Sequence, residues 1–169
     1  MKKLILISTI LFLQACGTIM FNPPVYELAE TTIPDFNVTG NVKIVNIQES
    51  SEPAIIHSYG GTKYESNYKT ITDTMVAQAY FELERHGKNS GGEDEKKISL
   101  SVTHLQSKYI AFYWKGTMTF SVSLGDAEKF EITVKHGTGA GAAQDLSGSI
   151  ADGVAALFKH EDVKAYLAK

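Results

Sequence analysis

The sequence feature that most restricts the fold is a stretch of alternating apolar and polar residues from position 110 to 124. Successive side chains of a β-strand point to opposite faces of its sheet, so strict alternation predicts a strand with one buried and one solvent-exposed face. Gly125 and Asp126 predict a hairpin turn after it, and residues 130–134 predict the returning strand. The apolar positions that share one parity are Ile110, Phe112, Trp114, Gly116, Met118, Phe120, Val122 and Leu124.

Apolar periodicity in the rest of the chain predicts further strands and helices. We expect strands over residues 38–47, with one bulge where the phase slips, over 55–59, and over 98–103 with a turn near Ser107. A helix is expected from Tyr68 to His86, capped by Thr70 or Thr72, and two more follow residue 141. The order β-β-α-β-β-β-α predicts an α+β fold. Its antiparallel sheet has about five strands, with helices packed on one face.

The N-terminus has the pattern of an export signal. Lys2 and Lys3 form a basic start, and residues 4–13 form an apolar run. Ten helical residues span about 15 Å, half of the ~30 Å that a bilayer core requires. Residues 1–15 are therefore predicted to be a signal peptide and not a membrane-spanning anchor.

The end of this signal resembles the lipobox of bacterial lipoproteins, through Leu13, Gln14, Ala15 and Cys16. In that family the cysteine is acylated and becomes the first residue of the mature chain. Cys16 is the only cysteine and is the predicted lipidation site, although Gln14 departs from the usual small or aliphatic residue. Gly17 follows in place of Asp, and the sorting pattern of such lipoproteins then implies export to the outer membrane.

We divide the chain into a signal peptide (1–15), a lipidated N-terminus and tether (16–34), and a single periplasmic α+β domain (35–169). Pro23 and Pro24 favour an extended tether. A hydrophobic content of 43% excludes a disordered chain, and a formal net charge of -3 argues against a nucleic-acid partner. A single cysteine excludes a disulfide framework and a cysteine-rich zinc site.

The domain also resembles the YajG-like outer-membrane lipoproteins. The resemblance lies in residues 141–157, from Gly141-Ala142-Ala143-Gln144 to Leu157, and in the strands from Ser99 to Val134. It implies a small lipoprotein that faces the periplasm and has no agreed biochemical activity. The architecture is similar as well to LptE-like and PqiC-like auxiliary lipoproteins of lipid and lipopolysaccharide export systems.

Several motifs that could support catalysis or ligand binding have simpler explanations. Residues 137–142 match a dinucleotide-binding loop, but no second parallel strand follows the next helix. His57, His104 and His136 lie on predicted strands, and nothing in their spacing builds a metal site. No serine lies in a nucleophile elbow. We predict no catalytic residue, no cofactor and no metal site.

The aromatic residues before Lys115 provide the only candidate binding surface. The parity of the long strand places Ile110, Phe112 and Trp114 in the core and leaves Tyr109 and Tyr113 on the polar face. Exposed aromatic residues on a sheet form a platform for a protein or lipid-like partner. Simple cross-strand packing is the alternative.

These observations predict a non-enzymatic outer-membrane lipoprotein that faces the periplasm and acts as a structural or protein-interaction module. The alternative is an auxiliary subunit of a lipid or lipopolysaccharide transport machine. The expected partners are the membrane, through lipidated Cys16, and an unidentified envelope protein.

Overall fold

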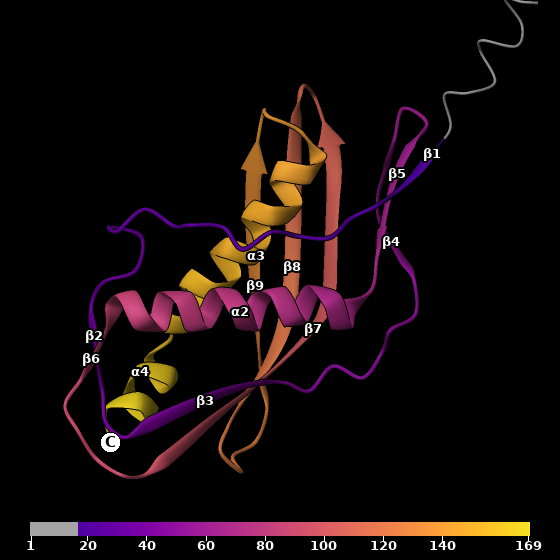
Figure 1. Cartoon of the computed structure of the whole chain (residues 1–169). Coiled ribbons are helices and arrows are strands. Elements are labelled where there is room, and N and C mark those ends of the chain that lie inside the picture. Colours follow the sequence, from indigo (N-terminus) through magenta and orange to yellow (C-terminus); the bar gives the residue numbers. More distant parts are fainter. Residues whose placement is uncertain (1–16) are drawn as a thin grey trace, which may run out of the picture.

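The computed structural model describes residues 17–169 (Figure 1). Cys16 and the predicted signal peptide lie outside the described residues. The described elements follow the order β1 (Gly17–Met20), β2 (Phe36–Val38), β3 (Asn41–Asn46), β4 (Ala54–Tyr59), β5 (Thr62–Ser66), α2 (Tyr68–His86), β6 (Gly87–Asn89), β7 (Glu95–Ile110), β8 (Tyr113–Leu124), β9 (Phe130–Thr138), α3 (Ala142–Lys159) and α4 (Glu161–Ala168).

The fold is α+β as predicted, but its main sheet is mixed and not antiparallel. Strands β7, β8 and β9 pair antiparallel in sequence order, and β4 pairs antiparallel with β5. Three other pairings in the sheet, β1 with β5, β3 with β7 and β4 with β7, are parallel. A separate small sheet joins β2 to β6, also in parallel. The predicted element order is wrong as well, because β1, β5 and β6 were not expected.

Strand β7 explains why the sheet is mixed. Its 16 residues are long enough for two strands to share one edge. β3 pairs with its first part, from Glu95 to Leu100, and β4 reaches it at Ser107. Helix α2 carries the chain across the sheet between these strands and β7, so the later strand runs parallel to the earlier ones.

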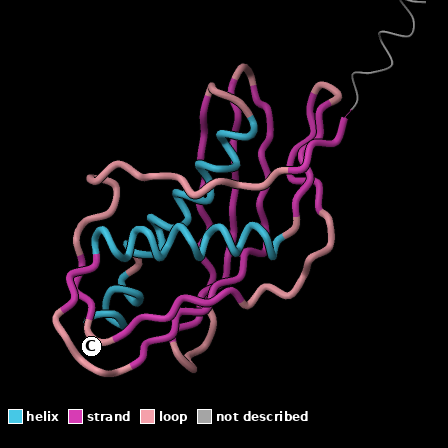
Figure 2. The backbone as a smooth tube through the Cα atoms, in the orientation of Figure 1, coloured by secondary structure: helices cyan, strands magenta, loops and turns pink. Residues whose placement is uncertain are grey.

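Helices α2 and α3 cover one face of β7–β9, which confirms the predicted one-sided arrangement (Figure 2). A Cβ at Gly153 of α3 would lie 3.3 Å from Met118 Sδ and 3.4 Å from Phe120 Cε1, so the helix closes tightly on β8. Within residues 17–169, no helix is both long and apolar enough to cross a membrane. The core between the layers includes Ile71, Met75, Val102, Met118, Phe120, Leu146, Val154 and Leu157.

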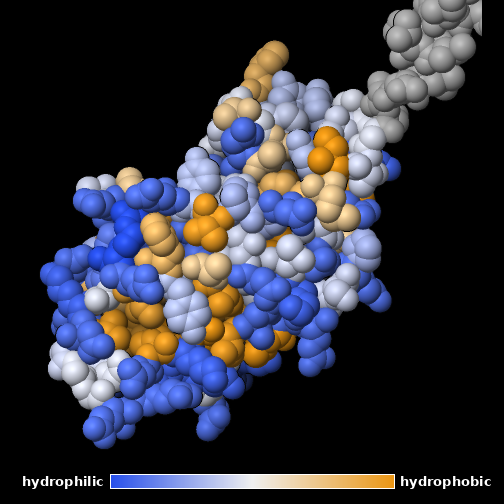
Figure 3. Space-filling view, viewed as in Figure 1, coloured by the Kyte–Doolittle hydropathy of each residue, from blue (hydrophilic) through white to orange (hydrophobic). Residues whose placement is uncertain are grey.

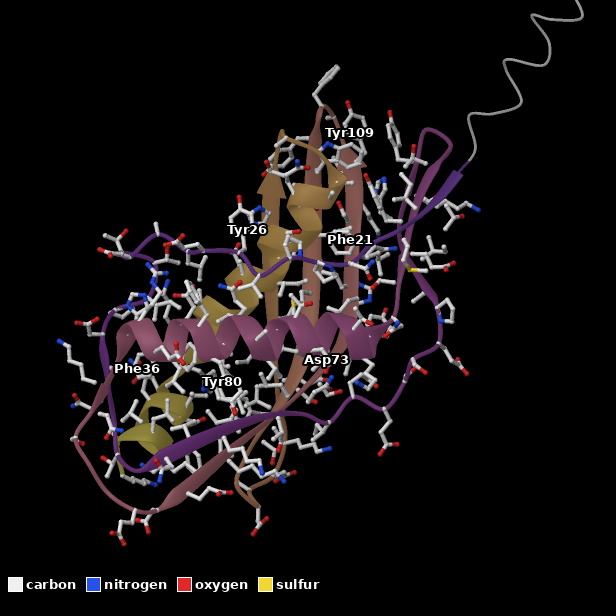
Figure 4. The ribbon with its side chains drawn as sticks, in the orientation of Figure 1. Phe21, Tyr26, Phe36, Asp73, Tyr80 and Tyr109 are labelled. Atoms are coloured by element: carbon white, nitrogen blue, oxygen red, sulfur yellow. The ribbon has the colours of Figure 1, made fainter. Side chains whose placement is uncertain are left out.

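Helix α2 has the predicted bounds but a different cap. Asn67 caps it by accepting a 2.8 Å hydrogen bond from the Thr70 backbone N–H, so the prediction of Thr70 or Thr72 is wrong. Thr72 is instead buried, and its hydroxyl accepts a 3.0 Å bond from Val102 N–H of β7. Tyr80 on the same helix accepts a bond of 2.8 Å from Ile44 N–H, which ties β3 to α2 (Figure 4).

The predicted turn near Ser107 does not exist, because β7 continues to Ile110. A bulge between Val102 and His104 shifts the register against β8. Up to Val102 the even positions face the core, and beyond the bulge Leu105 and Ser107 face it. The bulge interrupts the alternation of apolar and polar residues within β7, and this interruption was interpreted from the sequence as the end of the strand.

The strand predicted over residues 38–47 is two strands, and the prediction of a bulge within it is wrong, because β3 pairs with β7 in unbroken register from Asn41 to Asn46. β2 ends at Val38 and β3 begins at Asn41. Between them Gly40 has a φ of 77°, and a Cβ there would lie 2.3 Å from the Asp94 carbonyl oxygen. The two strands then pair with different partners, β2 with β6 and β3 with β7.

Residues 17–34, expected to form a tether, are largely extended but pack along the domain. Phe21 and Ile33 are buried. Gln78 of α2 exchanges hydrogen bonds with the Tyr26 backbone, and Arg85 donates a 3.0 Å bond to the Leu28 carbonyl. The prediction failed because these contacts come from isolated side chains and backbone groups, which leave no periodic pattern in the sequence.

Candidate functional site

The β7–β8 hairpin ends in a two-residue turn made of Ala111 and Phe112. Ile110 pairs with Tyr113 across the turn, and Tyr109 pairs with Trp114 one step further in. Phe112 is 89% exposed. The prediction that Ile110 and Phe112 lie in the core is therefore wrong, and the buried parity of the long strand holds only from about Trp114 onward.

The hairpin turn also separates the two candidate partner residues. In a two-residue hairpin the flanking residues pair and share a face, so Tyr113 lies with Ile110 on the open face of the sheet. Tyr109 lies with Trp114 on the opposite face. The predicted joint surface of Tyr109 and Tyr113 is wrong, because the sequence argument treated residues 110–124 as one uninterrupted strand.

Tyr109 belongs to an aromatic cluster that joins the two hairpins of the sheet. Its ring centroid lies 4.3 Å from that of Tyr59 at the end of β4 and 4.9 Å from that of Trp114. The His57 ring contacts Trp114 edge-on at 4.9 Å. Tyr109 is half-buried in these contacts (Figure 4). Cross-strand packing, the alternative to a binding role, accounts for it.

Tyr113 lines a concavity of about 440 Å³ on the open face, close to the hairpin tip. Lys108, Lys115 and Lys135 line the same concavity, and no Asp or Glu is among its described lining residues. The Lys115 ammonium lies 5.9 Å from the Tyr113 ring centroid. This combination of three cations with the Tyr113 ring and the apolar Ile110 side chain suits an anionic partner that also has apolar groups.

The sequence pattern did not predict that these lysines lie together. The position of the β7–β8 turn would have shown it, because the turn sets which residues of the two strands lie opposite each other. Once the turn is placed at Ala111 and Phe112, Lys108 falls opposite Lys115. On the neighbouring strand β9, Lys135 pairs with Thr117, two residues after Lys115, so it lies diagonally across from Lys115 on the same face. The false turn near Ser107 hid this arrangement.

A buried polar cluster lies on the other face, beneath Gly116. Asp145 in the first turn of α3 is fully buried, and its Oδ2 accepts a 2.5 Å hydrogen bond from the Ser107 hydroxyl. Ser149 donates a 2.8 Å bond to the Asp145 carbonyl oxygen. His57 Nδ1 donates to the Ser107 carbonyl oxygen at 2.9 Å. The cluster holds β4, β7 and α3 together through groups that solvent does not reach.

Burial raises the pKa of the Asp145 carboxyl above its usual value. The Ser107 hydroxyl, the nearby His136 and His57 and a backbone hydrogen bond from Gly116 oppose this shift in part. Asp145 Oδ1 has no hydrogen-bond partner among the described residues. A carboxyl with one bare oxygen in the core favours its neutral form.

This cluster does not form a hydrolytic site. Ser107 is 2% exposed and its hydroxyl donates to the Asp145 carboxyl, so no histidine draws its proton and no substrate reaches it. The three strand histidines also lie apart: His57 is buried, His104 is exposed on the open face, and His136 contacts Asp152 at 2.8 Å. Among residues 17–169, no three His, Cys, Asp or Glu side chains gather where they could hold a metal ion.

The glycine-rich segment at residues 137–142 connects β9 to α3. Gly141 is the N-terminal cap residue of α3 and has a φ of 140°. Among the described strands β9 pairs with β8 alone, and this pairing is antiparallel, unlike the parallel β-α-β unit of a dinucleotide-binding fold. The segment therefore makes the strand-to-helix turn, which was the simpler of its two explanations.

Comparisons with known proteins include a distant structural neighbour. No family model and no curated protein matches the sequence. The crystal structure of protein XCC0632 from Xanthomonas campestris, of family-model DUF330, aligns at 14% identity over 89% of this chain and 95% of that chain, with a TM-score of 0.48. These findings give no evidence for the YajG-like family.

Proposed function

We propose that this protein is a lipid-anchored lipoprotein of the outer membrane that faces the periplasm. Its domain acts there as a non-enzymatic structural or protein-interaction module. The observation that carries the proposal is the sequence Leu13-Gln14-Ala15-Cys16 after a basic and apolar leader, with the only thiol of the chain at the acyl acceptor position. Similarity to the YajG-like lipoproteins, through residues 141–157 and the strands from 99 to 134, is part of this proposal.

The described residues support a module that binds and does not catalyse. The buried Ser107 and Asp145 are closed to substrate. The accessible features are instead the lysine-lined concavity and the exposed aromatic turn. Such surfaces provide contact area and charge for a partner.

One observation favours the alternative role as an auxiliary subunit of a lipid or lipopolysaccharide transport machine. Strand β9 has nine residues and pairs only with β8 among the described strands, so its outer edge is available to a strand of a partner protein. Recovery of an envelope protein at stoichiometric ratio after mild crosslinking, lost when proline replaces a β9 residue with an outward N–H, would favour this role over the first.

The lipid anchor is tested by metabolic labelling of cells with an alkyne fatty acid, followed by membrane fractionation. The unaltered protein should take up label and sediment with outer membranes, and Cys16→Ser should abolish both. Gly17→Asp is the matched control: it should keep the label but leave the protein in the inner membrane. Label retained on Cys16→Ser would contradict the proposal.

A further inference from the structure

The β7–β8 turn and the first strand of the fold lie at the same end of the molecule. β1 begins at Gly17, the residue after Cys16, and Gly17 pairs with Thr62 of β5. Tyr59, which pairs with Thr62 across the β4–β5 turn, stacks on Tyr109 of β7. Figure 1 shows the start of β1 and both hairpin turns at this end. An acyl group on Cys16 would therefore join the domain here, with no linker residue in between.

The β7–β8 turn exposes apolar groups on a strained backbone. Ala111 and Phe112 have φ values of 47° and 75°, in the left-handed region that glycine, asparagine and aspartate tolerate best. Phe112 is 89% exposed and Ile110 is 47% exposed. Apolar surface is visible at the tip of this hairpin (Figure 3). Water is an unfavourable environment for these groups, and an apolar medium outside the chain would relieve the cost.

Behind the turn lies the concentration of positive charge described above. Lys108, Lys115 and Lys135 line one concavity together with Tyr113, and within residues 17–169 none of the three forms an ion pair. The whole chain has a formal net charge of -3, so this end is opposite in sign to the average surface. An anionic surface would attract it and repel the rest.

We propose that this end of the domain rests on the anionic bilayer that holds Cys16. Phe112 enters the headgroup region, and Lys108, Lys115 and Lys135 lie against lipid phosphates. The inference rests on the proposed lipid anchor, because a domain joined directly to an acylated residue is held with that end at the membrane. Aromatic side chains favour the depth of the headgroups, and lysines gain from the negative potential of anionic lipids.

The consequence for function is a fixed orientation. The C-terminus and α4 lie at the end of the molecule away from the hairpin turns (Figure 1). With the tip on the membrane, that end faces the periplasm. The edge of β9 then runs from the membrane outward and is presented sideways to an envelope partner.

The test uses the complete lipidated protein in vesicles of phosphatidylethanolamine and phosphatidylglycerol. Cys16 is the only native cysteine and its thiol is acylated in the anchored protein, so a second cysteine takes a polarity-sensitive fluorophore alone. The label is placed by Phe112→Cys at the tip. The matched control is Lys129→Cys, an exposed position in the loop between β8 and β9 at the opposite end of β8.

A quencher attached to lipid headgroups should quench the label at position 112 and leave the label at 129 unchanged. In the tip-labelled background, replacing Lys108, Lys115 and Lys135 with Gln should lower the docked-to-undocked ratio on the order of a hundredfold, about fivefold per lysine. The same change at Lys129, Lys159 and Lys169, which carry equal charge on exposed positions elsewhere, should leave it unchanged. On vesicles of phosphatidylcholine alone, the protein with all its lysines should be quenched as weakly as the variant with Gln at positions 108, 115 and 135.

The outcomes separate the two proposals. A label at 112 that stays in water while the acylated protein is held on the vesicles overturns the membrane-docked tip and leaves the lipoprotein intact. A label at 112 that is shielded from water in native membranes but not on vesicles also overturns the membrane-docked tip, because the tip then docks on a protein. Protein that carries no fatty acid and does not bind vesicles refutes the lipid anchor itself. Thermal unfolding of each variant checks that the domain is still folded.

Discussion

Gly116 of β8 lies where α3 approaches the sheet most closely, and replacing it with alanine tests the whole buried polar cluster. A Cβ at this position would lie 2.1 Å from Ser149 Oγ, 3.1 Å from Asp145 Oδ2 and 3.2 Å from the Asp145 carbonyl oxygen. Its φ is not in the left-handed region, so backbone strain plays no part. The whole cost comes from the collision with the helix.

We expect Gly116→Ala to lower the free energy of unfolding by about 2–4 kcal/mol. Overpacking of a close contact costs about 1–3 kcal/mol. Displacing the Ser149 hydroxyl also breaks its bond to the Asp145 carbonyl, which adds about 1 kcal/mol. For a domain of this size the melting temperature should fall by on the order of 10 °C.

Gly137→Ala is the matched control on the neighbouring strand. There a Cβ would lie 2.5 Å from the hydroxyl of Tyr113, on the open face, where the exposed ring can swing away. The effect of Gly→Ala on the unfolded chain is common to both variants and cancels in the comparison. We expect Gly137→Ala to change stability by less than about 1 kcal/mol.

Urea denaturation followed by the fluorescence of Trp114 measures both variants. Adding Ser149→Ala to Gly116→Ala removes the nearest obstacle, so the pair should be less destabilised than the sum of the single changes by about 1 kcal/mol or more. If Gly116→Ala and Gly137→Ala are equally stable, then α3 does not lie against β8 at this position and the reasoning fails.

Three further outcomes are expected. Phe120→Ala should cost ~3–5 kcal/mol because Phe120 is fully buried, while Thr119→Ala on the open face should cost less than about 1 kcal/mol; equal urea midpoints would place the strand one residue out of register. Ile33→Ala should cost ~2–5 kcal/mol, and an unchanged melt would mean that residues 17–34 are a free tether after all. Since the Asp145 pKa is raised on folding, its contribution to stability is complete below about pH 3.8 and is lost as pH rises through the folded value. Asp145→Asn should therefore flatten the fall in stability over that pH range, and a pH profile of unfolding identical to that of the unaltered protein would refute this assignment.

Local periodicity accounts for the elements that the sequence predicted correctly. The bounds of α2, the β8–β9 hairpin, the buried parity from Gly116 to Val122 and the helices after residue 141 all follow from side chains within one turn or one strand of each other. Alternation and four-residue spacing are properties of a single element, so they survive whatever the element packs against.

The candidate site shows where that reasoning stops. Tyr109 and Tyr113 were placed on one face because no local pattern marks a turn at Ala111 and Phe112, two residues that hairpin turns seldom use. The bulge at Val102 then hid the continuation of β7. The lysine-lined concavity was lost with the turn, since Lys108 and Lys115 meet only across it.

By itself, the sequence predicts an export signal and an acylated Cys16, and it determined a one-sided sheet under amphipathic helices. The tertiary structure decided that the sheet is mixed, that residues 17–34 pack on α2, and that three lysines gather behind an exposed Phe112. The physical reason is the range of the interactions. Periodicity records which side of an element is apolar, whereas parallel pairing, isolated buried side chains and charge clusters depend on residues far apart in the chain that meet only when it folds.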